Sequence, residues 1–238
     1  MGSEETGKEQ IREAVWDRLK EEKVGRFPFV PRRRIPNFSG AEAAAKRLVE
    51  HPLFEAARVV KINPDSPQRA VREAALEAGK IVVVPTPRLT DGFLVFDPEQ
   101  IDAAHYRDAS MISRWEPYAT RISLEELPSP ELIVTGCVAV TRDGKRAGKG
   151  HGYGDLEYAI LRELGHRPAP VVTTVHQLQV VEDFAVDAHD LWLSLIVTPE
   201  EIIEVDHDRG HSQGIDWSLL DEADLEAMPV LKELHPGK

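Results

Sequence analysis

The sequence has little of several features that would narrow its function at once. Its 238 residues include one cysteine, Cys137, so no intramolecular disulfide can form. No apolar run approaches the roughly 18 residues that a membrane span needs, and no secretory signal peptide is recognisable. We therefore expect a cytoplasmic protein, with no membrane partner, whose core forms without covalent cross-links.

Positive charge is also scarce. The chain carries 41 Asp and Glu residues against 29 Lys and Arg, a formal net charge of −12. This balance argues against a nucleic-acid partner, which would need a large basic surface. The basic residues are nevertheless clustered, at 32–34 and 145–149. A basic pocket on an acidic protein suits a small anionic ligand, although a solvated loop explains residues 32–34 equally well.

Helical and strand-like segments alternate along the chain, without a flexible linker. Apolar spacing predicts helices at 8–23, 40–50, 68–78 and 156–164. Apolar runs predict strands at 58–62, 81–84, 132–140, 171–175 and 192–197, with a short helix starting at 198–200. The alternation predicts a single α/β domain over 1–238 with a doubly wound, mostly parallel sheet, and a C-terminal segment, about 205–238, wrapped on the core.

Between the predicted strand 132–140 and the predicted helix 156–164 lies a loop rich in glycine and basic residues. Glycines let backbone N–H groups turn toward a phosphate, and a helix N-terminus adds partial positive charge. Arg146 and Lys149 supply full charges, and Asp155 can cap the helix or hold Mg²⁺. The loop has neither the Walker ending nor the dinucleotide spacing, so a plain turn with a basic rim stays an alternative.

Ligands of doubly wound sheets bind at the carboxyl ends of the strands. Asp65, Pro85 and the glycine-rich loop each follow or end a predicted strand, so we expect them at one edge. Lys8 and Arg12 are four residues apart and share a helix face, which can clamp a phosphate or simply face solvent.

Two histidine-containing clusters carry weaker signals. His207, Asp208 and His211 lack a fourth metal ligand at a recognisable spacing, which favours a polar loop over a metal site. The pair His189–Asp190 is compatible with an acid/base histidine and with a structural role.

Several motifs also occur in the order found in one known family. They are Lys8-x-x-x-Arg12, Asn63-Pro64-Asp65, Gly79-Lys80, Asp143-Gly144-x-Arg146-x-Gly148-Lys149-Gly150-x-Gly152-Tyr153-x-Asp155, Gln179, His189-Asp190 and Val197-Thr198-Pro199. Over about residues 8–204 the chain resembles the 5-formyltetrahydrofolate cyclo-ligases, or methenyltetrahydrofolate synthetases. The resemblance implies a Rossmann-like three-layer α/β/α fold, with ATP as co-substrate and Mg²⁺ as metal. We expect a monomer or small homo-oligomer acting on a small molecule.

In this family, ATP phosphorylates the formyl oxygen at N5 of the folate, and phosphate leaves as a neighbouring nitrogen closes the methenyl bridge. The resemblance implies catalytic roles for Arg146, Lys149 and Asp155, with Asp155 also near the metal. It implies nucleotide binding by Lys8, Arg12, Arg146, Gly148, Lys149, Gly150, His151, Gly152, Tyr153 and Asp155. It implies substrate binding by Asp65, Pro85, Tyr153 and Gln179.

The chain departs from the family pattern in a consistent way. It has Gly154 and Leu156 where the family has a second tyrosine and an arginine, and Asp65 in place of a longer glutamate. The chain also resembles a paralogue branch that includes the methenyltetrahydrofolate synthetase domain-containing proteins and has been linked to thiamin metabolism. This resemblance rests on Arg34-Ile35-Pro36-Asn37-Phe38, Asn63-Pro64-Asp65-Ser66-Pro67-Gln68, Pro85-Thr86-Pro87-Arg88-Leu89, Gly148-Lys149-Gly150-x-Gly152-Tyr153-x-Asp155-Leu156-Glu157 and Thr173-Thr174-Val175-His176. Three hypotheses follow. The first is a 5-formyltetrahydrofolate cyclo-ligase, and the second is a paralogue that binds nucleotide but uses another, for example thiamin-related, substrate. The third is a nucleotide- or folate-sensing binding module without turnover.

Overall fold

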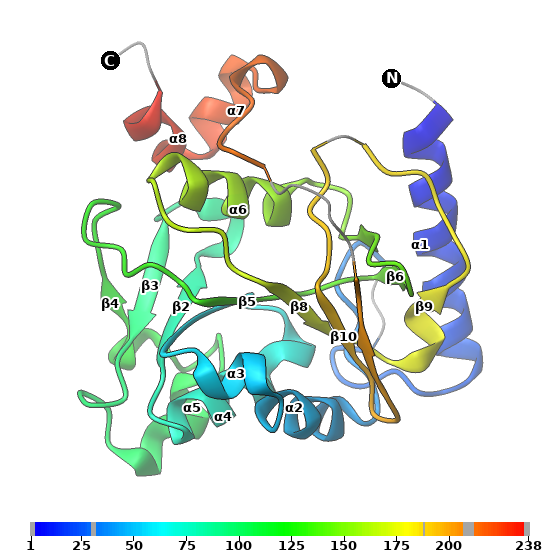
Figure 1. The fold of residues 1–238 in the computed structure, drawn as a ribbon, viewed down its shortest axis with the longest axis horizontal. Helices are drawn as coiled ribbons and strands as arrows, with labels where there is room; N and C mark the ends of the chain where they lie inside the picture. Colours follow the sequence, from blue (N-terminus) through cyan, green and yellow to red (C-terminus); the bar gives the residue numbers. More distant parts are fainter. Residues whose placement is uncertain (1–2, 30–31, 188, 207–211, 236–238) are drawn as a thin grey trace.

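An eight-stranded mixed sheet runs through the middle of the molecule (Figure 1). The computed structural model describes residues 3–29, 32–187, 189–206 and 212–235. In sheet order the strands are β11 (Ile202–Glu204), β10 (Leu195–Val197), β8 (Val171–Thr174), β5 (Leu132–Thr135), β1 (Val59–Ile62), β2 (Ile81–Pro85), β3 (Phe93–Phe96) and β4 (Thr120–Arg121). The inner strands from β10 to β2 are parallel, and β11, β3 and β4 add antiparallel edges.

Helices cover both faces of this sheet (Figure 1). One face carries α2 (Ala41–Val49), α3 (Pro52–Ala56), α4 (Arg69–Glu77) and α5 (Tyr106–Ala109). The other face carries α6 (Tyr153–Glu163), α7 (Glu222–Ala227) and α8 (Pro229–Leu234). This arrangement confirms the expected single-domain, three-layer α/β/α fold with a mostly parallel sheet. Among the described residues, no helix is long and apolar enough to cross a membrane.

The period-two alternation of strand side chains explains the two halves of the core. On β1, Val60 and Ile62 point to the face covered by α2 and α4, where each is fully buried. Burying such a side chain stabilises the fold by about 1.5–3 kcal/mol. Lys61 lies between them and therefore points to the opposite face, where it is also buried.

A second, three-stranded sheet packs beside the N-terminal helix α1 (Ser3–Glu21). It contains β7 (Arg146–Ala147), β6 (Ala139–Thr141) and β9 (Val180–Val181). The expectation of one strand over 132–140 is therefore wrong, because β5 and β6 belong to different sheets. The chain leaves the large sheet at Gly136, where a Cβ would lie 2.7 Å from Oδ2 of Asp65.

Two further expectations need correction. Residues 198–200 do not start a helix but turn the chain from β10 into the antiparallel β11, since Thr198 Oγ1 accepts hydrogen bonds from the N–H groups of Glu200 and Glu201. The helix expected from 156 begins earlier, at Tyr153, which brings its N-terminus to the glycine-rich loop. In the C-terminal segment, Val230 and Leu231 of α8 are buried in the core.

Candidate functional site

A cavity of about 750 Å³ opens at the carboxyl ends of β1, β2 and β5. Its lining comes from α1, the loops after these three strands, the glycine-rich loop and the start of α6. The remaining lining residues are Pro28, Arg33, Arg34, Ile35, Ile112, Asp187, His189 and Asp190. The expected site residues that line it are Lys8, Arg12, Asp65, Arg146, Gly148, Lys149, Gly150, His151, Gly152, Tyr153 and Asp155. The structure thus brings these residues together at the predicted edge of the sheet.

The glycine-rich loop bends back over the N-terminal helix. Gly150 and Gly152 have φ angles of 99° and 69°, a left-handed conformation that glycine adopts without strain. Arg12 of α1 donates from Nε to the Gly148 carbonyl at 2.8 Å. A Cβ at position 150 would lie 3.4 Å from the same guanidinium, an ordinary van der Waals contact, so the backbone conformation and not the space favours glycine there.

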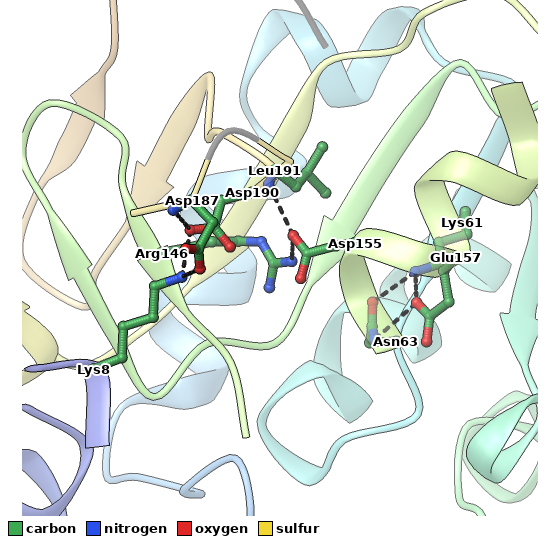
Figure 2. A network of polar contacts seen from close by, with 9 residues as sticks. All are labelled: Lys8, Lys61, Asn63, Arg146, Asp155, Glu157, Asp187, Asp190 and Leu191. Atoms are coloured by element: carbon green, nitrogen blue, oxygen red, sulfur yellow. Dashed lines mark hydrogen bonds and ion pairs between the residues drawn. The ribbon is translucent and has the colours of Figure 1, made fainter. Parts of the chain in front are cut away.

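Beneath the loop, Arg146 and Asp155 form a buried ion pair (Figure 2). Burial by itself would lower the pKa of Arg146, but the Asp155 carboxylate outweighs it, so the pKa is raised and the charge is permanent. Asp155 also accepts the N–H of Leu191 at 2.8 Å through the same oxygen, Oδ1. Oδ2 of Asp155 has no hydrogen bond within the described part of the chain.

The guanidinium of Arg146 explains one departure from the family pattern. A Cβ at position 154 would lie 3.2 Å from both terminal nitrogens of Arg146. That distance is tighter than an ordinary van der Waals contact, so Arg146 would have to shift. Gly154 therefore leaves room for Arg146 where the family usually has a second tyrosine.

Lys8 is held between two carboxylates at the end of the cavity nearest α1 (Figure 2). Its Nζ lies 2.7 Å from Oδ2 of Asp187 and 2.5 Å from Oδ2 of Asp190. Burial opposes the charged form, but hydrogen bonds to the two aspartates raise the pKa of Lys8 overall. The sequence alone did not single out Asp187, and it gave His189–Asp190 as an acid/base or structural pair and as one of the family motifs.

Lys149 extends from the loop to Asp65 across the cavity. Its Nζ lies 3.1 Å from Oδ1 of Asp65, and the side chain is about one-third exposed. The Asp65 backbone carbonyl accepts from Nη1 of Arg72 at 3.2 Å. Arg72 is fully buried, which lowers its pKa to about 9. Arg72 therefore holds the backbone of the turn after β1, and the Asp65 carboxylate faces the cavity.

The acidic side chains around Arg146 suit a divalent cation. Mg²⁺ prefers oxygen ligands and is commonly held by one or two carboxylates together with substrate phosphates. Asp155 offers its unbonded Oδ2, and ligand atoms of Asp187, His189 and Asp190 lie within 4.8 Å of one another. These residues can hold Mg²⁺ beside an anion bound to the loop.

Two residues expected to bind substrate lie elsewhere. Pro85 and Gln179 are both outside the cavity lining. Gln179 is buried and donates from Nε2 to the carbonyls of Cys137 and Val138, at 2.9 and 3.1 Å. It thereby satisfies backbone groups left unpaired where the chain passes from β5 to β6. His207, Asp208 and His211 lie outside the described residues.

The sequence matches one family model over residues 4–199, that of the 5-formyltetrahydrofolate cyclo-ligase family. The chain belongs to this family. It is 38% identical to a methenyltetrahydrofolate synthase domain-containing protein of Mus musculus, covering 98% of this chain and 64% of that one. It is 34% identical to the protein so named in Homo sapiens, covering 96% of this chain and 61% of that one. The chain therefore spans less than two thirds of the length of these relatives.

The fold is also found in a solved structure. The NMR structure of Aquifex aeolicus 5,10-methenyltetrahydrofolate synthetase matches with a TM-score of 0.54, covering 85% of this chain and 95% of that chain. The two sequences are 19% identical, so the comparison supports the fold.

We predict that Lys149→Ala weakens ATP binding about 10- to 100-fold, because it removes a cation from the cavity and leaves the Asp65 carboxylate unpaired there. The matched control is Lys145→Ala, in the turn between β6 and β7, whose ammonium pairs with the exposed Asp183 outside the cavity lining. Titration calorimetry with ATP and Mg²⁺ measures both variants. Equal affinities for the two variants would contradict the loop geometry.

Proposed function

We propose that the protein is an ATP- and Mg²⁺-dependent enzyme of the cyclo-ligase type, converting 5-formyltetrahydrofolate and ATP to 5,10-methenyltetrahydrofolate, ADP and phosphate. The observation that carries the proposal is that Lys8, Arg12, Arg146 and Lys149 gather with a glycine-rich loop on one cavity, which Arg33, Arg34 and Arg88 also line. Membership of the cyclo-ligase family supports the same reaction class.

The residues of the cavity suit phosphoryl transfer, in which catalysis rests on positioning and on neutralising charge. The ion pair with Asp155 keeps Arg146 charged and in place. Arg146 can therefore stabilise the transferring phosphoryl group without reorganising. Lys149 lies at the loop and can follow the phosphate from one oxygen to another. Mg²⁺, when held by Asp155 with Asp190, would neutralise further phosphate charge.

Binding of a phosphate chain requires an exchange of partners. In the structure the ammonium groups of Lys8 and Lys149 are each paired with aspartates. A polyphosphate can take the place of these carboxylates, and a divalent cation can then bind the carboxylates released. The proposal thus explains why an acidic cluster and a basic cluster share one cavity.

A second candidate is a paralogue that binds the nucleotide at this loop but acts on another substrate. It is favoured by Asp65, which is one methylene shorter than the family glutamate and is already paired with Lys149. The names of the similar mammalian proteins, which describe a synthase domain and not a synthase, agree with either candidate.

We predict that saturating ATP with Mg²⁺ raises the melting temperature. At about 100 times its dissociation constant, a ligand adds roughly 2.7 kcal/mol to the stability of the folded state. The same sample, mixed with 5-formyltetrahydrofolate, is assayed by absorbance for methenyltetrahydrofolate. Product formation supports the first candidate, and a melting shift without product supports the second. No shift with ATP, ADP or a non-hydrolysable analogue contradicts both.

We further predict that Asp65→Glu increases the affinity for 5-formyltetrahydrofolate severalfold, because the longer side chain restores the reach of the family glutamate. The ATP-induced melting shift should stay near that of the wild type. Asp65→Asn is the control, since it keeps the length and removes the charge. If Asp65→Glu binds the folate no better than the wild type, the length of this side chain does not limit folate binding.

A further inference from the structure

A buried polar cluster lies beneath the cavity, on the face of the sheet covered by α6 (Figure 2). Lys61 of β1 forms an ion pair with Glu157 of α6, and its Nζ donates to Oδ1 of Asn63 at 2.8 Å. Asn63 in turn donates from Nδ2 to Oε2 of Glu157 at 3.2 Å. The three side chains form a closed ring of contacts.

The cluster is costly as a purely structural device. Lys61 is 1% exposed and Glu157 is 4% exposed, so both charges have lost their water. Replacing a buried ion pair with well-packed apolar residues is often neutral or stabilising. Val83 and Ile133, which flank Lys61 on the two neighbouring strands, are apolar and would accept such a replacement. We therefore infer that the Lys61–Glu157 pair does more than stabilise the fold.

The orientation of Glu157 points to that role. Both hydrogen bonds and the ion pair use Oε2, and Oε1 has no hydrogen bond within the described chain. Figure 2 shows this second oxygen turned away from Lys61 and Asn63. Asn63 and Glu157 both line the cavity. The contacts with Lys61 and Asn63 thus hold the Glu157 carboxylate in place, and its Oε1 can accept a hydrogen bond from a ligand in the cavity.

An independent observation lies on the neighbouring strand. Thr135 ends β5, is 1% exposed and lines the same cavity, yet its hydroxyl has no hydrogen-bond partner in the described structure. Lys61 is in register with Ile133, two residues before Thr135, so Lys61 and Thr135 point to the same face of the sheet. A buried hydroxyl without a partner costs free energy unless a ligand supplies one.

We propose that Glu157 and Thr135 bind the substrate, and that they select a heterocycle with an exocyclic amino group beside a ring N–H. An ionised carboxylate only accepts hydrogen bonds, whereas a hydroxyl both donates and accepts, so together they complement such an edge. Because Lys61 already balances the negative charge of Glu157, we expect the edge of the heterocycle that contacts Glu157 to be uncharged. Lys61 and Asn63 are positioning residues. The proposal deepens the proposed function, since the pterin ring of a folate has such an edge.

The test uses 2-amino-4-oxopteridine, which carries this edge but neither the formyl group nor the glutamate tail, added to the full chain with excess ATP and Mg²⁺. Titration calorimetry compares the wild type with Thr135→Val and with the double variant Lys61→Met/Glu157→Gln, which removes both buried charges together. We expect affinity to fall about 2- to 10-fold in the first variant and about 10- to 100-fold in the second. The control is Glu73→Gln, in an ion pair with Arg69 on α4, away from the cavity lining.

A structural role makes different predictions. Because the Thr135 hydroxyl has no internal partner, Thr135→Val should leave the fold and the ATP-induced melting shift unchanged, so a loss of pteridine affinity reports on the ligand. Equal affinity in the wild type and both variants overturns the proposal, as does a wild type that does not bind the pteridine. Pteridine binding that depends on these residues, without formation of methenyltetrahydrofolate, would uphold this inference while the proposed reaction fails.

Discussion

The buried ion pair between Arg146 and Asp155 is the interaction on which the candidate site depends. It joins the small sheet, through β7, to the first turn of α6, and the same Asp155 oxygen fixes the chain at Leu191. Gly154 leaves the guanidinium room, because a Cβ there would lie 3.2 Å from its terminal nitrogens. Without the pair, the glycine-rich loop would lose the support that sets its distance from α1 and from the sheet.

Ion pairs with aspartates also hold other cations of the cavity. The protein carries a net charge of −12, yet seven Lys and Arg residues line its cavity, and three of them, Lys8, Arg146 and Lys149, pair with aspartates. Such pairs keep the cations charged and in place in the absence of an anion, and their burial weakens screening by salt. Under the proposed function, a bound phosphate replaces these carboxylates, which are then available to a metal ion. An acidic protein can in this way maintain a strongly basic site.

The sequence predicted the fold class and the family well, and the details of chain path less well. The β-branched runs of β1, β2 and β8 are long enough to identify, and the glycine-rich loop lies at the sheet edge that the alternation predicts. The close approach at Gly136 could not be predicted, because the side chains that a Cβ there would meet, Asp65 and Gln68, are distant in sequence. Gln179 shows the same limit: its contacts with the Cys137 and Val138 carbonyls arise only where the chain passes from β5 to β6. The binding roles of the cavity residues stay predictions, as does the ligand of Glu157, an ordinary helix residue by pattern.

The most direct test of the account is a crystal structure with a non-hydrolysable ATP analogue and Mg²⁺. The account predicts phosphate oxygens at the backbone N–H groups of residues 148–152, with Lys149 moved from Asp65 to the phosphates and Arg146 still paired with Asp155. The metal should lie between the phosphates and the carboxylates of Asp155 and Asp190. A nucleotide bound away from the glycine-rich loop, with Lys149 still on Asp65, would contradict it.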